Sequence, residues 1–430
     1  MPIAMHTTAT LARKARHLTA VLTICAAVPA LAAADPVMDW NDVARQLIVV
    51  PALTPIEQTR AMAIVHLAMH DAVSGITGEY QRYARVAGPR AEGSPEAAAI
   101  AAAYRALEGL FGASDVLAAK YAASLATHGI AVTDPGIAAG ESAAAVILAL
   151  RRHDGAALAA YPYLPPGVGT IGVWAPISSA ATAQALLPGW GSVVPFVLRS
   201  ASQFRPDAPP ALDSRRYARE YDELVRVGAS VNSTRTDEET QIALFWRASP
   251  TALWNPVLRQ AVASRQFTIS ETARVTALFY LATADASIAC WEAKYFYNFW
   301  RPQPAIAMGD LDGNATTVGD AAWRPLVPTP PHPEYPSGHT SNSSAMVAVL
   351  SQVFGDTPGF IIEATSPQNV GFVRHWQTFD EGMQEVIDAR VFSGIHFRTS
   401  DKVGARLGRQ VARFVMTHAL RPVKGRANER

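Results

Sequence analysis

The residues with the most distinctive chemistry lie in the C-terminal half of the chain, around the tetrapeptide Pro336-Ser-Gly-His339. A proline-rich run, 328–335, precedes it and a helix-forming run, 340–350, follows it. The prolines restrict the backbone, and the first turn of the following helix directs free N–H groups towards the Ser-Gly step. A helix end with serine, glycine and histidine beside it is suited to binding an anion.

Two cations precede this tetrapeptide. Lys294 and Arg301 are seven residues apart, and seven steps along an α-helix fall about 20° short of two full turns. A helix that continues through both residues therefore places them on one face, which Trp291 shares. The aromatic residues within 295–300 predict that this helix is buried, and buried cations need an anion.

A third cation follows near the C-terminus. Arg390 and His396 are six residues apart, with mostly apolar residues between them. With the two earlier cations, Arg390 can neutralise a tetrahedral oxyanion, to which the serine and glycine of the tetrapeptide can donate hydrogen bonds. His339 and His396 then remain for covalent chemistry and proton transfer.

Three motifs, taken in order, resemble the signature shared by vanadium-dependent haloperoxidases and the type 2 phosphatidic acid phosphatase (PAP2) superfamily. They are Lys294-x6-Arg301-Pro302, Pro336-Ser-Gly-His339 and Arg390-x5-His396, and the resemblance covers residues 291–401. In the N-terminal half, Trp174-Ala-Pro and Leu187-Pro-Gly-Trp-Gly191 are similar to the bacterial secreted haloperoxidase-like group.

The resemblance implies a role for each of these residues. His396 would be the axial ligand of vanadium in a haloperoxidase or the phosphorylated nucleophile in a phosphatase, and His339 would be the acid–base residue. Lys294 would also polarise bound peroxide. The implied cofactor is vanadate, and the implied partners are hydrogen peroxide, a halide and an organic acceptor. The implied oxyanion-binding residues are Lys294, Arg301, Ser337, Gly338 and Arg390.

Two departures from the phosphatase pattern favour the peroxidase. That pattern places serine before the last arginine and aspartate four residues after the last histidine. Here Ala389 and Ser400 occupy those positions, and Asp401 lies one residue further on. A displaced carboxylate would leave the histidine poorly oriented as a nucleophile.

Two further residues bear on the choice of halide. Trp291 matches a tryptophan that lines the halide region in similar haloperoxidases, and an ordinary core aromatic is the other interpretation. His332 stands where the family varies between phenylalanine and histidine, and histidine favours bromide or iodide over chloride. A turn residue held between two prolines is the alternative for His332.

Two other functions stay open. One is a soluble exported acid phosphatase with a phosphohistidine intermediate, and the other is a non-catalytic oxyanion-binding protein. Outside the three motifs, His66 and His70 have the i, i+4 spacing of a metal site, but core histidines are commoner on such an apolar helix. Asp285 and Glu292 are expected to pair with an arginine or with backbone groups, and 310–314 is expected to be a plain turn.

Helical periodicity accounts for most of the chain, and alternating strand patterns are nearly absent. We therefore predict an all-α helical bundle, as two packed bundle halves joined by long irregular loops. The predicted helices are 55–76, 94–111, 114–128, 135–152, 214–227, 241–246, 255–266, 270–300, 340–354, 381–397 and 400–418.

Composition suggests how the chain is divided. Residues 1–34 combine a basic start, an apolar stretch and an A-x-A cleavage site, which predicts a signal peptide and an exported protein, periplasmic or extracellular. The N-terminal half is then 35–230, with a Pro/Gly/Trp-rich segment at 155–210, and the C-terminal half is 231–430. Without 1–34, the chain has 34 Lys+Arg and 36 Asp+Glu, which argues against a nucleic-acid partner. No membrane span is expected in the mature chain.

Overall fold

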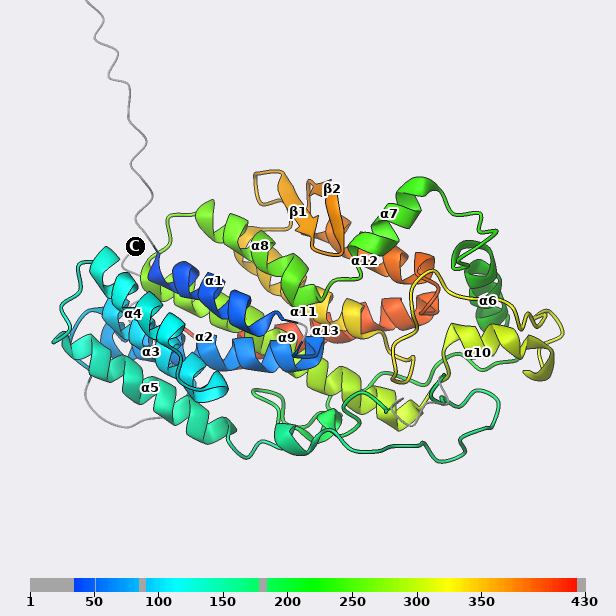
Figure 1. The fold of residues 1–430 in the computed structure, drawn as a ribbon, viewed down its shortest axis with the longest axis horizontal. Helices are drawn as coiled ribbons and strands as arrows, with labels where there is room; N and C mark the ends of the chain where they lie inside the picture. Colours follow the sequence, from blue (N-terminus) through cyan, green and yellow to red (C-terminus); the bar gives the residue numbers. More distant parts are fainter. Residues whose placement is uncertain (1–34, 51, 85–89, 178–183, 424–430) are drawn as a thin grey trace, which may run out of the picture. The chain divides into compact units, whose positions relative to one another are not determined.

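Helix α9 (Ile269–Tyr297) is the element against which helices from both parts of the chain pack (Figure 1). Thr268 and Glu271 form a capping box that starts it, and Asn298, at φ 49°, ends it in the left-handed conformation. Almost every residue from Ser270 to Lys294 is buried. α9 packs against α2, α11 and α13, so it links the N-terminal helices to the helices that carry the three motifs.

The computed structural model describes residues 35–50, 52–84, 90–177 and 184–423. Within these residues there are thirteen α-helices and one antiparallel sheet of two strands, β1 and β2. The predicted all-α bundle is thus confirmed. The other elements are α1 (Pro36–Ile48), α2 (Pro55–Thr77), α3 (Pro95–Phe111), α4 (Asp115–Thr127), α5 (Pro135–Arg151), α6 (Arg215–Val227), α7 (Asp237–Phe245), α8 (Pro250–Ala263), α10 (Pro302–Ala307), α11 (Gly338–Phe354), β1 (Ile362–Ser366), β2 (Asn369–Trp376), α12 (Phe379–Phe392) and α13 (Arg398–His418).

Close helix packing depends on small residues at two places. A Cβ at Gly140 of α5 would lie 2.3 Å from the carbonyl oxygen of Ala98 in α3. A Cβ at Gly408 of α13 would lie 2.0 Å from the carbonyl oxygen of Ser341 in α11. Both approaches are too short for any side chain, so glycine allows these helix pairs to pack backbone against backbone. The second pair brings α13 against the helix that begins at the tetrapeptide.

The predicted elements differ from the structure at several points. Helices α1 and α10 were not predicted, and α8 begins at Pro250 rather than at residue 255. The helix predicted over 270–300 ends at Tyr297, because 298–300 leave it to pair with 172–174 through backbone bonds. The helix predicted over 381–397 ends at Phe392, because Gly394 turns the chain at φ 76°. The hairpin of β1 and β2 was not predicted. It is short, and its alternation of buried and exposed residues is regular in β1 but weak in β2.

The Pro/Gly/Trp-rich segment has little regular structure in its described part and passes α9 on the way to α6 (Figure 1). Asp285, buried in α9, anchors it by accepting hydrogen bonds from the amides of 196–198 at 2.6, 2.8 and 2.9 Å. The backbone partner expected for Asp285 is thus confirmed. The segment is held rigidly beside the helix that carries Lys294.

The predicted signal peptide, 1–34, lies outside the described residues. The division of the remainder near residue 230 stays a prediction. Among the helices that the structure describes, none combines the length and the apolar character needed to cross a membrane.

Candidate active site

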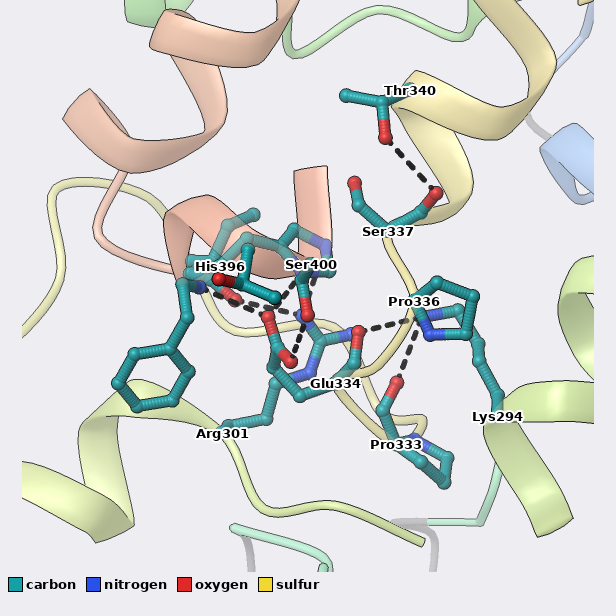
Figure 2. A network of polar contacts seen from close by, with 12 residues as sticks. Lys294, Arg301, Pro333, Glu334, Pro336, Ser337, Thr340, His396 and Ser400 are labelled. Atoms are coloured by element: carbon teal, nitrogen blue, oxygen red, sulfur yellow. Dashed lines mark hydrogen bonds and ion pairs between the residues drawn. The ribbon is translucent and has the colours of Figure 1, made fainter. Parts of the chain in front are cut away.

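His396 is oriented by a carboxylate that lies far away in the sequence. Its Nδ1 lies 2.8 Å from Oε1 of Glu334, and the Phe397 amide donates to the same oxygen at 3.0 Å. The hydroxyl of Ser400 donates to the other oxygen at 2.5 Å. Figure 2 shows His396 and Ser400 converging on Glu334. With three donors on its two oxygens, Glu334 acts as an acceptor, so the imidazole proton resides on Nδ1.

Arg301 gives independent support for this tautomer. Its Nη1 lies 3.3 Å from Nε2 of His396, and because a guanidinium can only donate, Nε2 must accept. Arg301 is itself fixed by the carbonyl oxygens of His332 and Ile395, both at 2.9 Å. Nε2 is therefore unprotonated, and its lone pair, which accepts a long contact from Arg301 here, can bind an electrophilic centre such as a metal or a phosphorus atom instead.

The prediction that Lys294 and Arg301 share one helix face is wrong. Arg301 lies beyond the end of α9, immediately before α10. The two side chains contact the same loop instead. The ammonium of Lys294 donates to the carbonyl oxygens of Pro333 and Glu334, both at 2.9 Å (Figure 2). Two of its three protons are thereby used, which leaves the third for a ligand.

Arg390 and His339 come from different helices but are held by one turn, 246–248, between α7 and α8. Arg390 donates to the carbonyl oxygen of Trp246 at 3.0 Å, and Nε2 of His339 lies 3.2 Å from the carbonyl oxygen of Ala248. A carbonyl can only accept, so His339 carries its proton on Nε2 and presents an unprotonated Nδ1. His339 is half-buried, whereas Arg390 is buried.

Several buried polar atoms at the centre of these residues have no partner in the part of the chain that the structure describes. They include Nε of Arg390. The hydroxyl of Ser337 and the carboxyl group of Asp401 make no hydrogen bond of good geometry, although Ser337 is close enough to lower the pKa of Asp401. Ser337 precedes α11 without capping it, so its hydroxyl is not engaged by the helix. A Cβ at Gly338 would lie 3.0 Å from the Trp291 ring and 3.8 Å from Cε of Lys294. An unpartnered arginine N–H and a serine hydroxyl beside a glycine fit a bound oxyanion.

Burial and mutual repulsion shift the pKa values of the buried cations. Burial lowers the pKa of Lys294 to about 7, and those of Arg301 and Arg390 to about 10. Burial, then the nearby cations, lower the pKa of His396 and of His339 well below the ordinary value, so both rings are neutral.

The buried carboxyl groups compensate this charge only in part. Burial raises the pKa of Glu334 to about 7, although its donors and the cations oppose that shift. Burial also raises the pKa of Asp401 well above the ordinary value. Burial therefore disfavours the negative form of both carboxyl groups while Arg301 and Arg390 remain charged, and an oxyanion would supply the missing negative charge.

Trp291 and His332 lie against each other at the edge of this site. Their ring centroids are 5.0 Å apart, and Nη2 of Arg301 contacts Nδ1 of His332 at 2.9 Å. Both side chains are buried. The structure therefore brings both residues of the predicted halide region to the oxyanion site, and their role in halide choice stays a prediction.

The other candidate residues lie elsewhere. His66 and His70 are buried core residues; Nε2 of His66 contacts Asn41 at 3.1 Å, and Nε2 of His70 contacts the carbonyl oxygen of Gln81 at 3.1 Å. Glu292 pairs with Arg205 at the edge of α9, as expected. Residues 310–314 include a turn in which Asp312 accepts from the amide of Asn314 at 2.8 Å.

Glu334 and the turn 246–248 were not predicted from the sequence. Glu334 stands in the proline-rich run, next to Tyr335 and two residues after His332. A carboxylate so close to the tetrapeptide is the sequence signal for this residue. The turn acts through carbonyl oxygens, which carry no side-chain signal at all.

The chain is similar to known vanadium-dependent haloperoxidases. Residues 274–425 match the family model of the VCPO second helical-bundle domain. A vanadium chloroperoxidase of Curvularia inaequalis is 23% identical in an alignment 280 residues long, and the aligned part covers 49% of this chain. The alignment spans 45% of that relative's length, or slightly less than half.

Solved structures show the same likeness over most of the chain. A structure described as the first bacterial vanadium-dependent iodoperoxidase is 26% identical, with a TM-score of 0.76 over 90% of this chain and 97% of that one. An apo-type bacterial vanadium-dependent chloroperoxidase shares the fold at 19% identity, with a TM-score of 0.68 over 85% of this chain and 95% of that one. We conclude that the chain is a relative of the vanadium-dependent haloperoxidases, shares their helical-bundle fold, and carries in residues 274–425 a domain similar to their second helical bundle.

Proposed function

We propose that this protein is a vanadium-dependent haloperoxidase that oxidises a halide with hydrogen peroxide. The observation that carries the proposal is the buried excess of cations around a neutral His396 whose Nε2 is unprotonated. Vanadate fits this site because it is a tetrahedral oxyanion that can take an apical imidazole ligand. Bound vanadate would polarise peroxide towards the halide, and the net reaction converts halide, peroxide and one proton into hypohalous acid and water.

Each residue has a part in this proposal. His396 would hold vanadium through Nε2, with Glu334 keeping its proton on Nδ1. The three cations, Ser337 and the Gly338 amide would hold the oxyanion by charge-assisted hydrogen bonds. The unprotonated Nδ1 of His339, on the half-buried side of the site, would take a proton from peroxide.

Iodide or bromide is the proposed halide. The pairing of Trp291 with His332 supports this choice, since histidine at that position favours these ions over chloride. The structural relative with the larger coverage is described as an iodoperoxidase, which supports iodide in particular. We also propose that the hypohalous acid reacts with an organic acceptor. The protein would be exported from the cytoplasm, with cleavage after the predicted signal peptide.

A phosphatase is the second candidate, and one observation favours it. The sequence argument against it rested on the displaced carboxylate, yet Glu334 supplies a carboxylate to His396 from another element. The imidazole is therefore oriented well enough to attack phosphorus. What favours the peroxidase is the likeness to haloperoxidases over most of the chain.

A paired assay separates the candidates. Purified protein is supplied with orthovanadate, hydrogen peroxide and iodide, bromide or chloride in turn, and separately with p-nitrophenyl phosphate. Halide oxidation that requires vanadate supports the proposal. Phosphate-ester turnover without oxidation of any halide would establish the phosphatase, and binding of vanadate with neither activity would establish a non-catalytic oxyanion-binding protein.

A further inference from the structure

Two adjoining cavities lie between α6, α13 and the irregular segment 203–210. Their volumes are about 440 and 430 Å³. They share four lining residues, so they form one continuous hollow, which we call the basic groove. The shared residues are Arg216, Thr399, Val403 and Arg406. None of the residues assigned to the oxyanion site lines it.

The basic groove carries cations without close ion-pair partners. Arg216, Arg219, Lys402 and Arg406 are exposed, and within the described residues no carboxylate lies at ion-pair distance from them; they are the groove's free cations. Arg216 is nevertheless near enough to Glu220 to lower the pKa of that carboxyl group. The remaining cations that line it are already paired: Arg205 with Glu292, and Arg398 with Glu223 and Asp388. The groove therefore has a positive potential that attracts an anion.

The carboxylates of the groove cannot neutralise these cations fully. Glu223 is engaged by Arg398. Glu220 accepts from the amide and the hydroxyl of Thr399, at 3.0 and 2.5 Å. Asp207 is the third acidic residue on the lining, against six basic ones. Guanidinium groups without partners, two of them at the junction of the cavities, suit a planar carboxylate or a tetrahedral head group.

The lining of the first cavity is mixed. It includes polar residues such as Gln203 and Gln410 and an apolar wall formed by Phe204, Pro206, Pro210, Tyr335 and Leu407. The hydroxyl of Tyr335 donates to the carbonyl oxygen of Asp207 at 2.6 Å. The hydroxyl of Tyr297 donates to the carbonyl oxygen of Pro206 at 2.5 Å. These bonds hold the segment in place, so the apolar wall exists before any ligand arrives.

We propose that the basic groove binds an organic anion whose apolar body lies against this wall. Its carboxylate, sulfonate or phosphate head would lie between Arg216 and Arg406, at the junction of the two cavities. A cavity of this size accommodates a molecule with one or two rings. The site is separate from the proposed peroxidase centre and does not depend on it.

The test compares two probes that differ in charge alone: 2-naphthoate and the neutral 2-naphthamide. Their binding to the full chain is measured by isothermal titration calorimetry at low ionic strength. The wild type should bind the carboxylate at least about tenfold more tightly than the amide. The variant Arg216→Gln/Arg406→Gln should lose this preference, and the control Arg152→Gln, an exposed arginine at the end of α5, should keep it.

Three outcomes would overturn the proposal. They are equal binding of the two probes to the wild type, an unchanged preference in the double variant, and loss of the preference in the oxyanion-site variant His396→Ala, which would place the carboxylate in the oxyanion site. Near-UV circular dichroism establishes that each variant is folded. Should the double variant misfold, Lys402→Gln alone must still weaken binding of the carboxylate relative to the amide.

Discussion

Nδ1 of His396 lies 2.8 Å from Oε1 of Glu334, which stands 62 residues earlier in the chain. This contact joins the loop before α13 to the loop before α11. It determines which imidazole nitrogen is unprotonated, and it connects the loop that leads into the tetrapeptide with the histidine of the last motif.

Replacing Glu334 with glutamine should weaken oxyanion binding while the fold persists. The glutamine carbonyl oxygen can still accept from His396 and Phe397, but the negative charge that makes the imidazole a stronger ligand is gone. We expect vanadate affinity to fall about 10- to 100-fold, as for other outer-shell partners of metal ligands. Vanadate titration of Glu334→Gln, with the exposed Glu363→Gln as control, measures this. Unchanged affinity would refute the orienting role.

Ser337→Ala should weaken oxyanion binding with little effect on stability. The buried hydroxyl makes no hydrogen bond of good geometry within the described residues and interacts only weakly with Asp401, whose pKa it lowers, so its removal should change the free energy of unfolding by less than about 1 kcal/mol. Oxyanion affinity should fall about 5- to 100-fold. Ser343→Ala, which removes another unpartnered buried hydroxyl of α11, should not change affinity. Equal effects of the two variants on binding would argue against a ligand at Ser337.

His339→Ala should separate binding from turnover. The half-buried ring contacts the carbonyl oxygen of Ala248 and is assigned to proton transfer, so vanadate affinity should change little while halide oxidation falls about 100-fold or more. Vanadate titration and initial rates on the same preparation provide both numbers. A loss of vanadate binding as large as the loss of rate would contradict this assignment.

Acid should destabilise the protein partly through His66. Burial lowers the pKa of this residue from 6.5 to about 3, so the unfolded chain binds the proton more readily between these values. Stability is therefore retained above pH 6.5 and lost as the pH falls, and His66 alone contributes a loss of about 2 kcal/mol at pH 5.

Urea unfolding at pH 7 and pH 5 tests this. His66→Phe keeps a ring against Tyr280, on which His66 is stacked. This variant should lose about 2 kcal/mol less free energy of unfolding between pH 7 and pH 5 than the wild type. The exposed His375→Asn should leave the pH dependence unchanged. A wild-type slope in the His66→Phe variant would show that another group is responsible.

Much of the fold could be predicted because its signals are local. The 3.6-residue period located most of the longer helices to within about five residues, and capping boxes at Thr54 and Thr236 start two of them in the structure. The errors occurred where distant contacts decide. Residues 298–300 leave α9 because segment 172–174 offers backbone partners, and that pairing has no local sequence signal.

The site shows the same limit. Lys294, Arg301 and Arg390 were predicted as a group from their order and spacing, although the single helix face expected for the first two was wrong. Glu334 was missed because its function comes from the return of the chain 62 residues later. The carbonyl oxygens of Trp246 and Ala248 act as fixed acceptors for residues of two other helices, which no side-chain pattern predicts.

The most direct test of the central proposal is the rate of iodide oxidation by hydrogen peroxide as a function of added orthovanadate. It is measured as triiodide absorbance for the wild type and for His396→Ala after removal of bound oxyanions. The proposal predicts a rate that rises with vanadate to saturation in the wild type and stays at background in His396→Ala. Oxidation that is independent of vanadate, or equal in the two proteins, would contradict it.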